Sequence, residues 1–349
     1  MNYKQGCLVF GILQLIFFIV AFYKYNKLYL IDIPCLEDEE PICELMEIRP
    51  TNKTTIKLAI LGDQGVSENA HKVLELIKRE KADAIIHSGD HGYQSTPAEW
   101  DSMITKYLGD SFPVFSSVGN HDIYNWAEYQ ELLWKRIKKN PAVFCDGCLG
   151  IFSSCNFHHI YLLQVSPGII PLKSPQNFVN NQFECINKKR NIFQWRSNFL
   201  FIVSILITTE ILTISLSVCT LHPYSETDPE FGGEDLVNVL RKCKQEGALI
   251  TSSHAHTYRR FSKDNLENDP KSTRFFLGAN SSLQSVAGTG GEELDFLIKG
   301  LDHGALFCNF EILPVANPKD DTLKASCYFK TVGGETLDQF VLYTTYENV

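Results

Sequence analysis

The sequence has no excess of positive charge. Its 349 residues include 32 Lys and Arg against 41 Asp and Glu, which gives a formal net charge of −9 at pH 7. Proteins whose main ligand is a nucleic acid hold the phosphate backbone with clustered Lys and Arg. The short basic run INKKR, residues 186–190, is typical of a solvated loop. The composition therefore argues against nucleic acid as the main partner.

The sequence also lacks internal repeats, low-complexity segments and the composition of a disordered chain. Hydrophobic residues make up 44% of it, enough to bury a sizeable core. Its length suits one large α/β domain or two small ones.

A 17-residue uncharged run, CLVFGILQLIFFIVAFY, lies near the N-terminus at residues 7–23, with Lys residues on both sides. It is intermediate between a long signal-peptide core and a short membrane span, and no small-x-small cleavage site follows it. A buried core helix is a third interpretation, which the terminal position disfavours. We interpret residues 1–30 as a signal peptide or an uncleaved signal anchor, and residues 31–55 as a linker.

Two glycosylation sequons agree with entry into the secretory pathway, Asn52-Lys53-Thr54 and Asn280-Ser281-Ser282. We expect either a membrane-anchored protein, associated with the bilayer through residues 7–23 and with its domain in the lumen or outside the cell, or a secreted protein.

Ten cysteines follow Cys7, an even number that permits disulfides in an oxidising compartment. Cys145, Cys148 and Cys155 also suggest zinc ligands, but no fourth ligand has a suitable spacing. We therefore prefer disulfides.

From residue 56 short apolar runs alternate with amphipathic segments, as in βαβ units. Thr96, Pro97 and Glu99 predict a capped helix over residues 96–108, and residues 233–246 predict a second, amphipathic helix. After residue 270, runs with little helix between them suggest a sheet that completes a sandwich. The expected strands are 56–61, 83–88, 112–118, 158–165 and 248–253, then 274–278, 305–312 and 325–332.

Polar side chains follow four of these strands. In an open α/β sheet the carboxyl ends of the strands line one crevice, where ligands bind. Carboxylates, an amide and imidazoles in one crevice suit two metal ions, with one carboxylate able to bridge them. The residues are Asp63 in ILGDQG, Asp90 in HSGD, Asn120 and His121 in SSVGNHD, and His254 and His256 in SSHAH.

The order of GD-x-G, GD-x-x-Y, GNHD, the histidine of VCTLH and H-x-H resembles the calcineurin-like metallophosphoesterase superfamily over roughly residues 56–345. Tyr93 in GDHGY and the run SHAHTYRR are similar to the purple acid phosphatase branch in its short form. The resemblance implies an α/β fold. We expect an α/β/β/α sandwich of two mixed sheets flanked by helices, with a dinuclear metal site at the C-terminal ends of the strands, in one domain over residues 56–349.

The resemblance also implies ligands for Fe(III) and for a divalent ion, which would be Fe, Zn or Mn. The harder Fe(III) takes carboxylate and phenolate oxygens, and the softer ion takes imidazoles and an amide oxygen. The ferric ligands would be Asp63, Asp90, Tyr93 and His256; Asp90 would bridge to the divalent ion, which Asn120, His222 and His254 would bind.

Two further residues have catalytic roles under this resemblance. His121 would hydrogen-bond the phosphoryl group or protonate the leaving alcohol, and Asp122 would orient the His121 ring. Other interpretations remain open: Tyr93 as a core aromatic, and Asp122 as a helix cap.

The sequence departs from the family pattern at three places. Ser253 stands where a glycine is usual, and Gln64 replaces an aromatic residue, which we expect to remove packing at the edge of the site. The third departure is an apolar stretch, residues 196–217, just before His222. We interpret it as an insertion or a retained intron; a membrane span over 199–221 is the alternative, although Glu210 near its centre would cost about 3 kcal/mol.

The predicted function is hydrolysis of phosphate monoesters by a metal-dependent phosphatase, acting on a phosphorylated small molecule or a phosphoprotein. Two alternatives keep the same fold. One is a metallophosphodiesterase without a ferric-tyrosinate site, and the other is a catalytically dead, anchored binding protein that cannot place His222.

Overall fold

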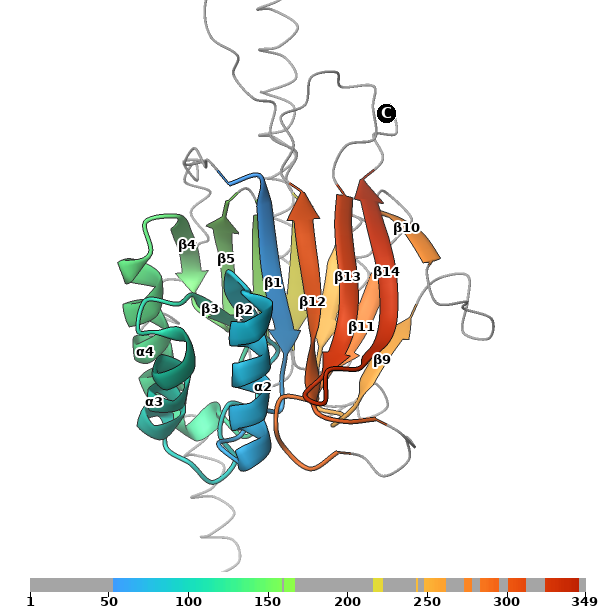
Figure 1. Cartoon of the computed structure of the whole chain (residues 1–349). Helices are drawn as coiled ribbons and strands as arrows, with labels where there is room; N and C mark the ends of the chain where they lie inside the picture. The colour runs from blue at the N-terminus through green and yellow to red at the C-terminus, as the bar shows by residue number, and fades with distance from the viewer. Residues whose placement is uncertain are drawn as a thin grey trace, which may run out of the picture. The chain divides into compact units, whose positions relative to one another are not determined.

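The computed structural model describes residues 53–158, 160–166, 216–221, 243, 248–261, 273–277, 283–294, 301–311 and 324–344 (Figure 1). In this part of the chain two sheets of seven strands each are present. Phe115 contacts Phe157 across the sheets, with ring centroids 5.6 Å apart, and Tyr258 stacks on Phe329 at 4.1 Å. The two sheets therefore pack face to face, which confirms the predicted mixed α/β sandwich.

The first sheet carries the start of the domain. Its order is β10-β14-β13-β12-β1-β2-β3, with β1, β2 and β3 parallel and β12 antiparallel to β1. Strands β2 and β3 are buried along their whole length, as expected when both faces of a parallel sheet are covered. The bounds are β1 Thr55–Leu61, β2 Ala84–His87, β3 Val114–Ser116, β10 Thr273–Leu277, β12 Gly304–Glu311, β13 Lys324–Thr331 and β14 Thr336–Thr344.

The second sheet has the order β4-β5-β6-β7-β8-β11-β9, with β6, β7, β8 and β11 parallel. Strand β7 pairs with both β6 and β8, and its last residue, Leu221, lies opposite Ser252. The strand before His222 is therefore present, and it begins inside the expected 196–217 insertion. The bounds are β4 Val143–Cys148, β5 Phe152–Phe157, β6 Ile160–Val165, β7 Leu216–Leu221, β8 Leu249–Ser252, β9 Tyr258–Phe261 and β11 Leu283–Ala287.

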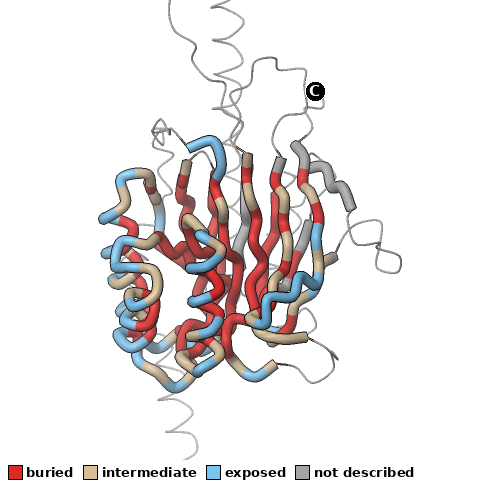
Figure 2. Tube along the Cα trace, viewed as in Figure 1, coloured by how far each residue is buried: buried red, intermediate tan, exposed pale blue. Residues whose placement is uncertain are grey.

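Three helices lie on the outer face of the first sheet: α2 Glu68–Glu80, α3 Pro97–Leu108 and α4 Trp126–Lys139 (Figure 1). Helix α3 begins with the predicted capping box, in which Thr96 and Glu99 bind each other's backbone N–H groups. Figure 2 shows buried strands and helices whose outer surfaces are exposed. The second expected helix, 233–246, lies outside the described residues except for Cys243.

Disulfides join directly paired positions in both sheets. Cys145 bonds Cys155 across β4 and β5, and Cys308 bonds Cys327 across β12 and β13. Cys148 is also disulfide-bonded. The preference for disulfides over a zinc site is therefore confirmed for these cysteines.

Several predictions fall on undescribed residues: the 7–23 segment, Asn52, Asn280, most of the 196–217 stretch and His222. Within the described ranges, no helix is long and apolar enough to cross a membrane.

The end of the SHAHTYRR motif has a structural role. Asp338 on β14 accepts hydrogen bonds from the Tyr258 hydroxyl at 2.8 Å and from Nε of Arg260 at 2.7 Å. Because Tyr258 and Arg260 belong to β9, these contacts join the edge of the second sheet to the first.

Candidate metal centre

Three candidate ligands lie just beyond strand ends in an unusual backbone conformation. Asp63 after β1, Asp90 after β2 and His254 after β8 have φ values of 53°, 57° and 77°. Residues other than glycine rarely adopt positive φ, and such strain is concentrated at functional sites.

Asp63, Tyr93 and His256 meet in one cluster. The Tyr93 hydroxyl donates to Oδ1 of Asp63 at 3.2 Å and lies 2.9 Å from Nε2 of His256. Nδ1 of His256 lies 2.7 Å from the carbonyl oxygen of Glu293, which can only accept, so Nδ1 carries the proton. In the neutral ring Nε2 then has a lone pair facing the cluster, as a metal ligand requires.

Asn120 and His254 form a second cluster, with Oδ1 of Asn120 3.1 Å from Nδ1 of His254. One backbone amide connects the two clusters, and a second joins Asp90 to the residue after Asn120. The amide of His254 donates to Oδ2 of Asp63 at 2.8 Å, and the amide of His121 donates to Oδ1 of Asp90 at 2.9 Å. The structure thus brings together six of the seven predicted ligands through a connected set of contacts, and the seventh, His222, is not described.

The carboxylates of Asp63 and Asp90 are buried close to each other. Burial, reinforced by the charge of Asp90, raises the pKa of Asp63 well above its usual value. Burial and the charge of Asp122 raise the pKa of Asp90 to about 7. Within the described residues no Lys or Arg forms an ion pair with Asp63. Burying carboxylates together is costly, and a bound cation would offset that cost.

Glycines leave room for both carboxylates. A Cβ on Gly119 would lie 2.1 Å from Oδ1 of Asp90, and one on Gly288 would lie 2.3 Å from Oδ2 of Asp63. As placed, the described His, Cys, Asp and Glu side chains include no group of three positioned to hold a metal ion. The donor types and the buried negative charge nevertheless fit two metal ions.

Metal ions should stabilise the protein more as pH rises. The raised pKa of Asp90 means that, between about pH 4 and pH 7, the metal-free folded state binds more protons than the unfolded state, so this group's contribution to stability falls with increasing pH. Metal ions bind the ionised carboxylate instead. The test is to measure the melting temperature with and without divalent metal at a pH below about 4 and at a pH above about 7. The increase caused by metal should be larger at the higher pH. A metal-induced shift that does not change with pH would contradict it.

The two predicted catalytic residues lie in different surroundings. His121 is exposed, and its ring is tilted against that of Tyr93 with centroids 4.3 Å apart. Asp122 is fully buried and accepts from the amides of Gly119, Asp90 and His91 at 2.8–2.9 Å, and it also lies 2.8 Å from Nδ1 of His91.

The expectation that Asp122 orients the His121 ring is therefore corrected, because both Asp122 oxygens are directed to buried N–H groups. The alternative of a helix cap holds for the position alone: Asp122 precedes the short 3-10 helix Ile123–Asn125 as its N-cap residue, but its side chain makes no cap hydrogen bond. Although burial raises the pKa of Asp122, the neighbouring His91 and the N–H donors hold it below its usual value. The sequence patterns assign no role to His91, although it lies directly after Asp90 in the motif.

Two of the departures from the family pattern have structural explanations. Ser253 does not have positive φ, and its hydroxyl donates to the carbonyl oxygen of Ser88 at 2.7 Å. Gln64 is fully buried, and its Oε1 accepts from Nε1 of Trp100 at 2.8 Å. Gln64 therefore lies in the core and not at the open edge of the site, and its Nε2 is a buried donor without a hydrogen-bond partner among the described residues.

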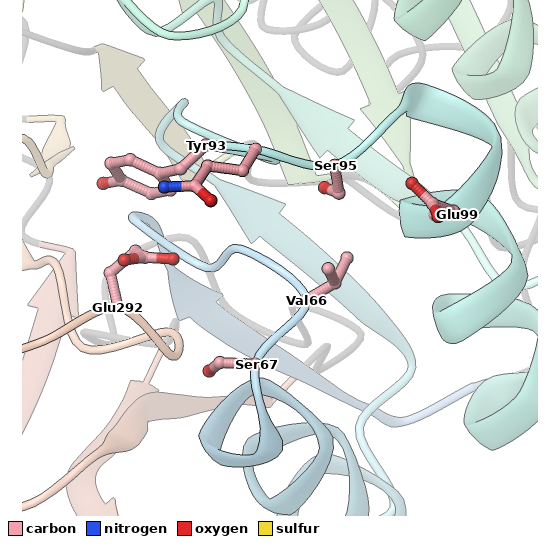
Figure 3. Close-up of a pocket in the computed structure, with 7 residues that line it drawn as sticks. Val66, Ser67, Tyr93, Ser95, Glu99 and Glu292 are labelled. Carbon is pink, nitrogen blue, oxygen red and sulfur yellow. The ribbon is translucent and has the colours of Figure 1, made fainter.

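A pocket of about 410 Å³ lies beside Tyr93 (Figure 3). Glu292 stands near the Tyr93 end of the pocket in this view and Glu99 at the other end. The lining residues are Val66, Ser67, Tyr93, Gln94, Ser95, Glu99 and Glu292.

Comparison with known proteins gives the family. The solved structure of purple acid phosphatase PPD1 from yellow lupin (Lupinus luteus) seeds is 13% identical with a TM-score of 0.51; the match covers 85% of this chain but only 55% of that one. This likeness shows the fold alone. GAP50, the anchor in the inner membrane complex of Plasmodium, is 12% identical with a TM-score of 0.48, covering 82% of this chain and 88% of that one. A dimetal phosphatase from Danio rerio is 12% identical with a TM-score of 0.42, covering 84% and 99%.

No curated protein matches the sequence. The model of the calcineurin-like phosphoesterase family matches residues 56–258, more than half of the chain and all of the candidate metal ligands. The chain belongs to the calcineurin-like phosphoesterase family.

Proposed function

We propose that the protein is a metal-dependent phosphatase that hydrolyses phosphate monoesters. Family membership supports a phosphoesterase. One observation supports the assignment as a phosphatase of the purple acid type. The Tyr93 oxygen lies between Oδ1 of Asp63 and Nε2 of His256. The Tyr93 hydroxyl thus lies beside two other residues predicted to bind the ferric ion.

Two metal ions would be held by the predicted ligands. Asp63, Tyr93 and His256 offer donors for Fe(III), and Asn120 and His254 offer donors for a divalent ion. Asp90, in the loop after β2, would be the carboxylate that bridges the two ions. When bound, such ions activate water and offset charge on the phosphate oxygens. His121 is exposed beside Tyr93, and we expect it to donate to a phosphoryl oxygen or to the leaving alcohol.

The pocket beside Tyr93 is our candidate for the alcohol part of the ester. Its lining offers hydroxyl groups, an amide and two carboxylates, and none of the lining residues is Lys or Arg. This charge favours neutral or cationic alcohols over groups that carry further negative charge.

Tyr93→Phe tests the ferric-phenolate assignment. The oxidised, iron-loaded wild-type protein should show a visible charge-transfer band, because a phenolate is a good donor to a hard trivalent ion. We expect Tyr93→Phe to remove the band and to leave Asn120 and His254 in place, so that some phosphatase activity survives with other metals. Tyr124→Phe, at an exposed tyrosine, should keep the band.

A colourless wild type that contains Fe(III) would exclude phenolate ligation and favour a metallophosphodiesterase without this centre. Hydrolysis rates on a panel of monoesters and diesters distinguish a phosphomonoesterase from a metallophosphodiesterase. They should be measured with the same protein. Full metal content without hydrolysis of either class would support the third possibility, a binding protein without catalytic activity.

We also propose that the protein enters the secretory pathway, anchored through residues 7–23 or secreted after their cleavage. The disulfides Cys145–Cys155 and Cys308–Cys327 support an oxidising compartment. Expression in a glycosylating host should give a protein whose mass falls on glycosidase treatment, through Asn52 or Asn280. An unchanged mass together with cytosolic fractionation would contradict the proposal.

A further inference from the structure

His91 links two loops that carry candidate ligands. Its Nδ1 lies 2.8 Å from Oδ2 of Asp122, and its Nε2 lies 2.7 Å from Oγ of Ser116. None of the three side chains has exposed surface. His91 belongs to the loop after β2, which also contains Asp90, whereas Asp122 belongs to the loop after β3, which also contains Asn120.

This Ser-His-Asp arrangement is not a nucleophilic triad. A nucleophilic serine must reach a substrate, but Ser116 is fully buried in β3. Its hydroxyl also lies within hydrogen-bond distance of the carbonyl oxygens of His87, at 3.1 Å, and Ser117, at 2.9 Å. The contacts serve to hold the ring of His91 in place.

Aromatic neighbours fix the plane of the His91 ring. His87 stacks on it with centroids 4.3 Å apart, and Tyr129 stacks at 4.8 Å. Trp100 meets it edge-on at 4.7 Å. Because these contacts restrict rotation, Nδ1 is directed at the Asp122 carboxylate.

Asp122 connects the His91 ring to the backbone of Asp90. Oδ2 of Asp122 accepts from the backbone amide of Asp90 at 2.8 Å and from that of Gly119 at 2.9 Å. In return, the His121 amide donates to Oδ1 of Asp90. The two loops are thus connected by contacts in both directions, directly behind the carboxylate expected to bridge the metal ions.

We propose that His91 is a positioning residue for the hydrolysis: by binding Asp122 it fixes the loop geometry that directs Asp90 and Asn120 toward the metal ions. This inference rests on the proposed function, although the contact between the loops exists without it. The residue acts through Asp122 and does not contact substrate or metal.

Three variants of the full-length protein separate the contacts of His91. His91→Leu removes both polar contacts at similar size. His91→Asn retains an N–H donor near the position of Nδ1 for Asp122 but does not reach Ser116. Of the two polar contacts of the His91 ring, Ser116→Ala removes only the one to Nε2, together with the Ser116 contacts to the carbonyl oxygens of His87 and Ser117. His71→Leu, at a half-buried histidine of α2, is the matched control.

The measurements are zinc affinity, kcat and KM for a phosphate monoester, and amide hydrogen exchange of the metal-free protein. We expect His91→Leu to lower zinc affinity and kcat by about 10–100-fold, as is typical when a residue that orients a ligand is lost. The amides of Asp90 and His91 should exchange faster in this variant. His91→Asn should recover most of the loss, and Ser116→Ala and His71→Leu should stay close to wild type.

Wild-type zinc affinity and protected amides in His91→Leu would overturn the proposal. Equal losses in His91→Asn and His91→Leu would also overturn it, because they would assign the effect to core packing. If His91→Leu fails to fold, His91→Asn is compared with Ser116→Ala. A larger loss of zinc affinity and kcat in Ser116→Ala than in His91→Asn would contradict the proposal, because Ser116→Ala leaves the contact between His91 and Asp122 in place. A wild type without zinc binding or activity would refute the proposed function, and hydrogen exchange would still test the contact.

Discussion

Asp90→Asn is expected to abolish turnover, with a fall in kcat/KM of at least about 10³-fold. The substitution keeps the size of the side chain and an oxygen that can accept from the His121 amide. It removes the negative charge that would be shared by two metal ions. The measurement is kcat/KM on a phosphate monoester, together with the number of metal ions bound per chain.

The matched control is Asp110→Asn. Asp110 pairs with Lys139 on the surface, and its side chain is 66% exposed, so loss of its charge should leave activity unchanged. Full metal occupancy with near wild-type activity in Asp90→Asn would refute the dinuclear site.

Gly119→Ala should produce the second large loss, because the new methyl group has no space. The Cβ would lie 2.1 Å from both the amide nitrogen and Oδ1 of Asp90. The backbone of one loop must shift, which displaces the carboxylate from its hydrogen bond with the His121 amide. We expect kcat/KM to fall by about 10²-fold or more, since misplacement by about 1 Å has this effect on a reacting centre.

Gly333→Ala distinguishes this effect from a general cost of replacing glycine. A Cβ there meets only Oγ1 of Thr331 at 3.7 Å and Oδ2 of Asp302 at 3.8 Å, which are ordinary contacts. Thermal unfolding and metal content should be measured for both variants. Wild-type activity in Gly119→Ala would show that the loops adjust freely, and it would argue against a rigid site.

The sequence alone determined the strands that carry the site and most of the residues that meet there. Apolar runs followed by polar residues located Asp63, Asp90, Asn120 and His254 at strand ends, because parallel strands place their carboxyl ends along one edge. The capping box of α3 was predicted as well, since its signal lies within four residues of sequence. Strands β4, β5, β9, β11 and β14 were missed. Strand β4 contains Asp146 and Gly147, which have low strand propensity, and it is paired through a disulfide to β5.

Only the tertiary structure decided which partner each polar side chain takes. The sequence places Asp122 directly beside His121 and 31 residues from His91, yet the contact is with His91. The reason is the parallel pairing of β2 with β3, in which His87 lies opposite Ser116 and the loops beyond both strands come together. Gln64 likewise meets Trp100, 36 residues away, inside the core. Local patterns indicate where the chain turns and which face is buried, whereas hydrogen bonds between distant loops depend on how the strands are ordered in the sheet.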